Sequence, residues 1–187
     1  ATVTDRETGH VLLMAAAGSV SYHHSTTAQP LRIARTMGTP GCGDLIRWTA
    51  PTDETQPIYS LFPEAKRIFF GSGRICQSRQ VKHGTHYRLY AALCTNLGSL
   101  VVYSDNFGIS WHALGGSEAR PAPDGDEPKC EELPDGSVLL SCRQSRGGQR
   151  YYNIFTYTDT HAATGSWATV ATTDLPGITN GSATNGE

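Results

Sequence analysis

A turn that ends in tryptophan recurs along this chain, and its spacing constrains the fold more than any other feature. The clearest copy, Ser104–Trp111, fits the pattern S-x-D-x-G-x-[ST]-W except that Asn106 takes the place of Asp. Weaker copies end at Trp48 and Trp167, so the three tryptophans are 63 and 56 residues apart. Each copy lies beside a β-rich segment, and this period suits a four-stranded propeller blade with long loops.

The chemistry of this turn predicts a structural role. Serine and Asx side chains can hydrogen-bond neighbouring backbone groups and close a hairpin. Gly108 supplies a conformation that other residues resist, and Trp111 is expected to bury its ring between strands. The copy that ends at Trp48 is degraded, because Pro40 and Cys42 interrupt it. These turns mark a fold, not an active site.

The rest of the chain reads as all-β. No long stretch has a clean 3.6-residue apolar period, and polar turn residues separate short β-rich runs. The runs are His10–Ala15, Ile68–Phe70, Tyr87–Leu93, Leu100–Tyr103, Ser137–Ser141 and Asn153–Tyr157. A short helical turn is expected around Ile58–Lys66.

Composition excludes several classes of partner. Charged residues make up 17% of the 187 residues and the net charge is −2, so nothing suggests nucleic acid or an anionic membrane surface. The longest apolar run, Val11–Ala17, is too short to span a bilayer. No signal peptide is visible and residue 1 is Ala, which suggests a processed start or a piece of a longer protein.

Cysteine and histidine spacing argues against a metal site. The five cysteines are an odd number without a C-x-x-C pair, so we expect buried free thiols and no dense disulfide framework. His83 and His86 form H-x-x-H, but no third ligand stands at a spacing typical of a metal site. Surface histidines are the preferred interpretation.

The segment Asp126–Arg143 predicts a β-hairpin that places two charged groups together. Pro134–Gly136 is a turn triplet flanked by apolar residues, which favours a three-residue loop. In that register Cys130 pairs with Leu140, and Glu127 lies opposite Arg143 on the same face. The alternative is an ordinary cross-strand salt bridge.

Two of these motifs resemble those of sialidases. S-D-N-F-G-I-S-W is similar to their Asp-box, a BNR repeat, and the hairpin D-E-P-K-C-E-E-L-P-D-G-S-V-L-L-S-C-R resembles their segment with a catalytic Glu and a substrate-binding Arg. The likeness is closest to exo-sialidases (neuraminidases) of glycoside hydrolase family 33 from Bacteroidetes, and it extends through Phe69–Lys82 and Arg150–Asp159. It implies a six-bladed propeller of which residues 1–187 are about three blades, the middle of one catalytic domain.

The resemblance also implies roles for residues. Glu127 matches the glutamate that activates a nucleophilic tyrosine, which replaces the usual carboxylate nucleophile in this family. Arg143 matches an arginine that binds the sialic acid carboxylate, since a guanidinium can donate paired hydrogen bonds to it. The implied activity is release of terminal α-linked sialic acid with retention of configuration, without a cofactor.

Other candidate residues carry alternatives. Similarity to the family suggests that Arg74 and Gln77 lie near the rim of the substrate pocket, but exposed polar residues of a strand are an equal alternative. Tyr152 is expected to line the site, whereas aromatic packing within a blade is favoured for one residue of the Tyr151–Tyr152 pair. Glu131 is a secondary candidate acid or a solvated charge.

Several parts of the family's machinery have no match here. An early arginine, the general acid/base aspartate, a third arginine and the nucleophilic tyrosine cannot be identified in the sequence. We therefore expect the isolated chain to be inactive and the full-length protein to act on sialylated glycans. The resemblance implies a secreted, periplasmic or cell-surface protein. The alternative is a non-catalytic propeller that binds glycan or protein.

Overall fold

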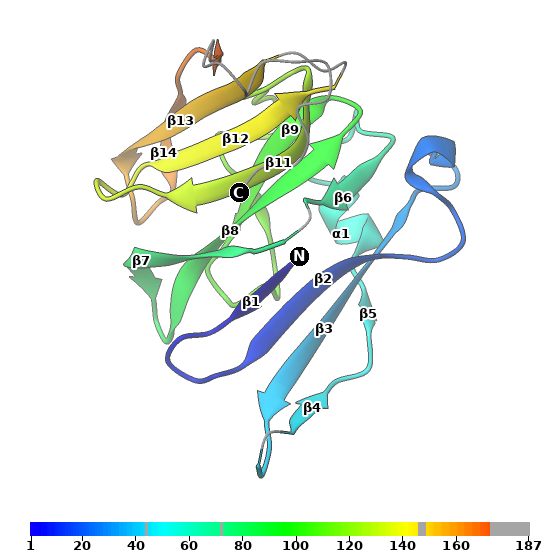
Figure 1. The fold of residues 1–187 in the computed structure, drawn as a ribbon, viewed down its shortest axis with the longest axis vertical. Coiled ribbons are helices and arrows are strands. Elements are labelled where there is room, and N and C mark those ends of the chain that lie inside the picture. The colour runs from blue at the N-terminus through cyan, green and yellow to red at the C-terminus, as the bar shows by residue number, and fades with distance from the viewer. Residues whose placement is uncertain (44, 72, 146–148, 173–187) are drawn as a thin grey trace.

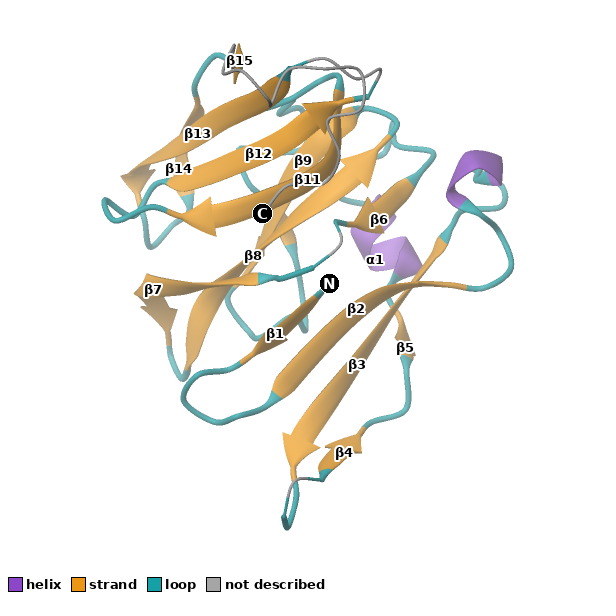
Figure 2. Ribbon diagram, viewed as in Figure 1, coloured by secondary structure: helices purple, strands orange, loops and turns teal. Residues whose placement is uncertain are grey.

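A computed structural model describes residues 1–43, 45–71, 73–145 and 149–172 as three consecutive antiparallel sheets (Figures 1 and 2). The first sheet contains β1 (Thr2–Thr4), β2 (Val11–Ala17), β3 (Arg32–Pro40), β4 (Ile46–Trp48) and β5 (Thr52–Asp53). The second contains β6 (Ile68–Phe70), β7 (Cys76–His83), β8 (His86–Thr95), β9 (Gly98–Ser104) and β10 (His112–Ala113). The third contains β11 (Gly125–Glu132), β12 (Val138–Gln144), β13 (Arg150–Asp159), β14 (Thr164–Trp167) and β15 (Ala171–Thr172).

Each sheet is built as a propeller blade. Strands that follow one another in sequence are also neighbours in space, from β1 to β4 and from β11 to β14. In the second sheet, β6 and β7 share one edge of β8 and together take the place of a first strand. The first strands meet, because Thr2 of β1 forms a parallel bridge with Arg74, just before β7. The all-β prediction and the prediction of about three blades are confirmed.

Strand β8 explains how neighbouring blades hold together. Its residues alternate between two faces, as in any strand. Leu89, Ala91 and Leu93 belong to the core between the first two blades, whereas Tyr90 and Ala92 belong to the core between the second and third. Burial of apolar surface on both faces is the main stabilising contribution at this place.

The turn Ser104–Trp111 has the geometry that its sequence predicts. Ser104 Oγ accepts a hydrogen bond from the backbone N–H of Gly108 (2.9 Å), and Trp111 is buried, with its ring centroid 5.4 Å from that of Phe70. Gly108 has a φ of +80°, and a Cβ there would lie 2.4 Å from Leu12 Cδ2. The turn of the second blade therefore packs directly on the first blade.

Some sequence-based expectations need correction. Trp48 ends β4 but is 50% exposed, so the degraded copy of the turn does not anchor its tryptophan. The helix α1 covers Thr55–Tyr59, a few residues earlier than expected, and η1 is a single 3-10 turn at Tyr22–His24. Four cysteines are buried free thiols as expected, but Cys42 is exposed.

A buried arginine connects the second and third blades. The side chain of Arg88 is fully buried and donates to both carboxylate oxygens of Asp105, at 2.7 and 2.8 Å. Its remaining donors reach the carbonyls of Thr160 (2.6 Å) and His161 (3.1 Å), which follow β13. His83 Nε2 accepts another of these hydrogen bonds at 3.0 Å, so this histidine is not the free surface residue expected from the sequence.

Replacing this arginine should destabilise the protein strongly. Arg88→Met leaves the Asp105 carboxylate and two carbonyls without their donor, a loss expected to cost about 3 kcal/mol of unfolding free energy. Arg32→Met is the matched control, because the Arg32–Asp53 pair is 60% and 49% exposed and should contribute less than about 1 kcal/mol. Urea denaturation measures both. Equal losses in the two variants would contradict the role given to Arg88.

Candidate functional site

The β11–β12 hairpin follows the expected register only near its turn. Cys130 pairs with Leu140 as predicted, and the pairing continues to Lys129. The register then shifts between Asp126 and Lys129, so Arg143 pairs with Asp126. The prediction that Glu127 lies directly opposite Arg143 is therefore wrong by one residue.

A β-bulge at Glu127 and Pro128 causes this shift. Proline has no N–H to donate to the ladder, so within strands it is found at edges and bulges. Glu127 takes a φ of +46°, which is uncommon for a residue with a side chain. The neighbouring blade accommodates the bulge with a glycine, since a Cβ on Gly71 would lie 2.4 Å from the carbonyl oxygen of Pro128.

The bulge brings two carboxylates to one guanidinium. Arg143 Nε donates to Glu127 Oε2 at 2.8 Å, and Arg143 Nη2 donates to Asp126 Oδ2 at 2.5 Å. The predicted direct contact between Glu127 and Arg143 is thus confirmed despite the different register. Arg143 Nη1 makes longer hydrogen bonds to the main-chain carbonyls of Gln144 (3.2 Å) and Ser145 (3.3 Å).

Two residues from other blades complete this group. Cys94, on β8, donates its thiol to Asp126 Oδ1 at 3.0 Å. Its sulfur also lies 3.8 Å from the hydroxyl of Tyr22, on the loop between β2 and β3. We call Tyr22, Cys94, Asp126, Glu127 and Arg143 the Arg143 cluster; it draws on all three blades.

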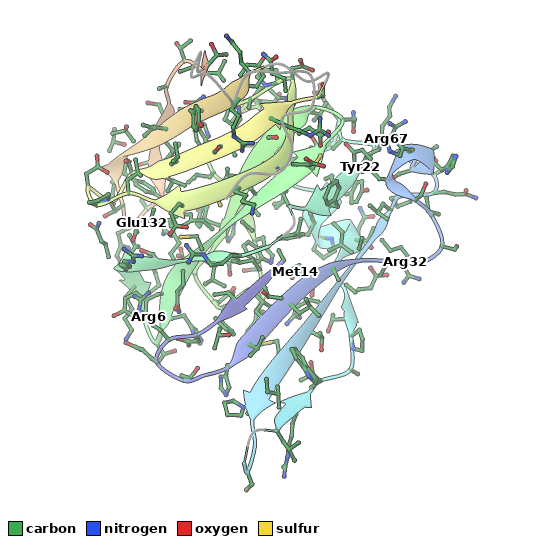
Figure 3. The ribbon with its side chains drawn as sticks, in the orientation of Figure 1. Arg6, Met14, Tyr22, Arg32, Arg67 and Glu132 are labelled. Atoms are coloured by element: carbon green, nitrogen blue, oxygen red, sulfur yellow. The ribbon has the colours of Figure 1, made fainter. Side chains whose placement is uncertain are left out.

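The ring of Tyr22 is itself held by neighbours. Phe69 packs edge-on at 5.2 Å between ring centroids, and the guanidinium of Arg67 lies 5.9 Å from the centre of the Tyr22 ring. Figure 3 shows Arg67, which directly precedes β6, beside Tyr22. Phe69 and Arg67 thus fix the position of the Tyr22 ring.

The electrostatics of the cluster favour binding over nucleophilic attack. Burial raises the pKa of the Tyr22 hydroxyl and raises the pKa of the Cys94 thiol to about 12. Both groups stay protonated near neutral pH, the opposite of an activated nucleophile. The hydrogen bond to Glu127, followed by the charge of Asp126, raises the pKa of Arg143, which stays charged. Its guanidinium is the group suited to binding an anion.

Arg74 and Gln77 lie outside the Arg143 cluster. They line a cavity of about 510 Å³ together with Arg6 and Glu131, between β1, β7 and β11. Arg74 forms an ion pair with Glu131, four residues along β11 from Glu127, which is roughly 13 Å of extended strand. The structure therefore does not bring Arg74 and Gln77 to the Arg143 cluster.

Tyr152 lies on β13, where it pairs with Ser141 of β12. Among the described residues, the hydrogen-bond partners of the Arg143 side chain come from residues 126, 127, 144 and 145, and Tyr152 is not one of them. Tyr151 packs against the core between the second and third blades, which confirms the packing role expected for one tyrosine of this pair.

Three members of the cluster, Tyr22, Cys94 and Asp126, were not predicted from the sequence. Asp126 is adjacent to Glu127, and the proline that follows was a readable signal for an irregular strand. Cys94 and Tyr22 carry no such signal, because long-range packing alone brings them to β11.

Comparison with known proteins supports the fold. No protein-family model matches the sequence, and no curated protein sequence is significantly similar to it. The structure is similar to the crystal structure of the intramolecular trans-sialidase from Ruminococcus gnavus in complex with oseltamivir carboxylate, with a TM-score of 0.54 and 19% sequence identity. The match covers 81% of this chain and 28% of that chain. The fold is about three blades of a sialidase-type β-propeller.

The described residues give no indication of a metal site or of a membrane-spanning helix. Within residues 1–43, 45–71, 73–145 and 149–172, no group of three or more His, Cys, Asp or Glu side chains is arranged to hold a metal ion. Among the same residues, no helix has the length and apolar character needed to cross a membrane.

Thiol accessibility tests the burial of the cluster. A water-soluble disulfide reagent should modify Cys42 rapidly in the native protein, because Cys42 is exposed, while Cys94 stays unmodified at pH 8. All five thiols should react after denaturation, and Cys42→Ser should remove the rapid phase. Mass spectrometry of the labelled peptides identifies the sites. Labelling of Cys94 as fast as that of Cys42 would contradict the burial described here.

Proposed function

We propose that this chain is the central part of an exo-α-sialidase that releases terminal sialic acid from glycoconjugates. The observation that carries the proposal is the pairing of Arg143 with Glu127 on three blades of a sialidase-type propeller. The similarity at 19% identity supports the fold alone, so the activity is inferred from the side chains of the Arg143 cluster.

Arg143 is the proposed ligand for the sialic acid carboxylate. Its Nε and one donor of Nη2 are held by Glu127 and Asp126, which fixes the plane of the guanidinium. The hydrogen bonds from Nη1 go to neutral carbonyls at 3.2 and 3.3 Å. A substrate carboxylate can replace these acceptors, because charge-assisted hydrogen bonds are shorter and stronger than neutral ones.

Glu127 is the proposed base for a tyrosine nucleophile supplied by a part of the protein beyond these blades. Sialic acid carries a carboxylate beside its anomeric carbon, so a neutral tyrosine approaches with less repulsion than a carboxylate would. The tyrosine oxygen bonds to the anomeric carbon, its proton passes to Glu127, and the aglycone leaves with a proton from a separate acid. Water then releases the sugar with retained configuration. The Glu127 side chain is 35% exposed, which leaves it open to such a partner.

The remaining parts of the proposal follow from this activity. Residues 1–187 would form part of one propeller domain that contributes further arginines, the acid/base and the nucleophile from other blades. The substrates would be sialylated glycoproteins, glycolipids or oligosaccharides, and the protein would be secreted, periplasmic or on the cell surface.

A second candidate is a non-catalytic propeller that binds glycan or protein. The observation that favours it is the local charge, since Asp126 and Glu127 together outweigh the single positive charge of Arg143. A surface of this kind would suit a ligand without a strong negative charge.

Kinetics on a fluorogenic sialoside separate the roles of the two residues. In the full-length protein, Glu127→Gln should lower kcat and leave KM nearly unchanged, because the Gln amide oxygen can still accept from Arg143 Nε but cannot take the tyrosine proton. Arg143→Lys should raise KM, with a loss of roughly 1.5–3 kcal/mol, since lysine cannot reproduce paired hydrogen bonds to a carboxylate. Turnover that is unaffected by Glu127→Gln would remove the catalytic assignment.

The chain alone provides a second test. The 187-residue chain should show no turnover of the sialoside, whereas the full-length protein should hydrolyse it, because Glu127 and Arg143 cannot complete a double displacement by themselves. A full-length protein that binds sialosides without turnover would favour the glycan-binding candidate. Turnover by the 187-residue chain would show that all catalytic groups lie within it.

A further inference from the structure

The sequence-based assignment leaves Asp126 without a role, yet its carboxylate accepts more hydrogen bonds than that of Glu127, the other acid of the Arg143 cluster. Oδ2 accepts from Arg143 Nη2 at 2.5 Å, while Oδ1 accepts from the Glu127 N–H at 2.8 Å and from the thiol of Cys94 at 3.0 Å. Each of the three donors comes from a different residue, so the orientation of this carboxylate is over-determined.

We propose that Asp126, oriented by the Cys94 thiol, is a positioning residue that sets the guanidinium of Arg143 for binding a carboxylate. This inference rests on the proposed function, because the carboxylate in question is that of the sialoside. Neither Asp126 nor Cys94 needs to touch the substrate. Their effect passes through Arg143.

Cys94 is suited to this task because it is buried and its strand is paired on both sides. It lies on β8, between β6 and β9, where it pairs with Phe69 on one side and Ser99 on the other. Its side chain is buried and its thiol remains protonated, so it has a hydrogen to donate to Asp126, its nearest acceptor at 3.0 Å. The rigid core of the second blade thereby fixes a carboxylate on the third blade.

Because of the bulge, the two neighbouring carboxylates bind different nitrogens of Arg143. Glu127 holds Nε and Asp126 holds Nη2, so both lie along the same edge of the Arg143 guanidinium. With Asp126 in place the opposite edge faces away from both acids, and among the described residues its partners are the carbonyls of Gln144 and Ser145. Without Asp126, no carboxylate holds Nη2, so the guanidinium can rotate about its bond to Glu127 and the Nε–H is held less firmly.

Steady-state kinetics of the full-length protein test the proposal. Asp126→Asn and Cys94→Ala should each raise KM for the sialoside by about ten-fold while changing kcat by less than about two-fold, the pattern of lost ground-state binding. Cys94→Ser should restore most of the affinity, because a hydroxyl can donate to the same oxygen. Unchanged or lower KM in Asp126→Asn would overturn the proposal, since it would mean that Asp126 competes with substrate for Arg143.

Cys76→Ala is the matched control. Cys76 is also a buried thiol of the second blade, but its S–H is directed at Glu131, at 3.6 Å. Glu131 lines the cavity beside Arg74 and Gln77, not the Arg143 cluster. Loss of a buried thiol by itself should therefore leave KM unchanged in this variant. An equal rise of KM in Cys76→Ala and Cys94→Ala would reduce the effect of Cys94 to general packing and overturn its positioning role.

A readout without turnover separates this proposal from the proposed function. In protein labelled with ¹⁵N-arginine, the Nε–H of Arg143, assigned by its loss in Arg143→Lys, should exchange slowly with water. The exchange should become faster in Asp126→Asn and Cys94→Ala but not in Cys76→Ala. If the wild-type protein lacks sialidase activity yet shows this pattern, the proposed function is wrong, but the positioning of Arg143 by Asp126 and Cys94 is supported. An unchanged exchange rate in Asp126→Asn would contradict the positioning role of Asp126.

Discussion

The bulge in β11 is the constraint on which the site depends. Pro128 cannot donate to the ladder, and the chain responds by placing Glu127 at positive φ and moving Asp126 into the position opposite Arg143. A regular strand would present alternate residues to opposite faces, so only one of these acids could reach the guanidinium. The bulge brings both acids to it.

The neighbouring blade makes this geometry possible. Gly71 leaves room for the carbonyl of Pro128, and β8 supplies the buried thiol that fixes Asp126. The same strand contributes apolar side chains to two cores and carries Arg88, whose guanidinium connects the second and third blades. The site is therefore supported by a strand whose residues are mostly buried, and its precision follows from blade packing more than from the hairpin itself.

The sequence was informative where local chemistry decides the structure. Pro134–Gly136 fixes the turn and hence the pairing of Cys130 with Leu140, and the Ser104–Trp111 segment closes its turn through its own side chains. The predicted register is wrong on the N-terminal side of Pro128, because the prediction assumed a regular ladder of paired residues along the whole hairpin. A proline within a strand is itself a sign of a bulge. That irregularity could have been predicted.

Other features could not be read locally. Arg74 and Gln77 were expected near the rim of the substrate pocket, yet they line a separate cavity together with Glu131. Cys94 meets Asp126, 32 positions away, and Tyr22, 72 positions away, through packing that no short pattern encodes. Residue type predicted the chemistry of the site better than it predicted which residues meet there.

A crystal structure of the full-length protein with a bound sialic acid analogue tests the central claim most directly. The account predicts that the carboxylate of the analogue accepts hydrogen bonds from Arg143 and displaces the carbonyls of Gln144 and Ser145, while Asp126 and Glu127 keep their places on Nη2 and Nε. An analogue carboxylate bound elsewhere, for example at Arg74, with Arg143 unchanged, would contradict it.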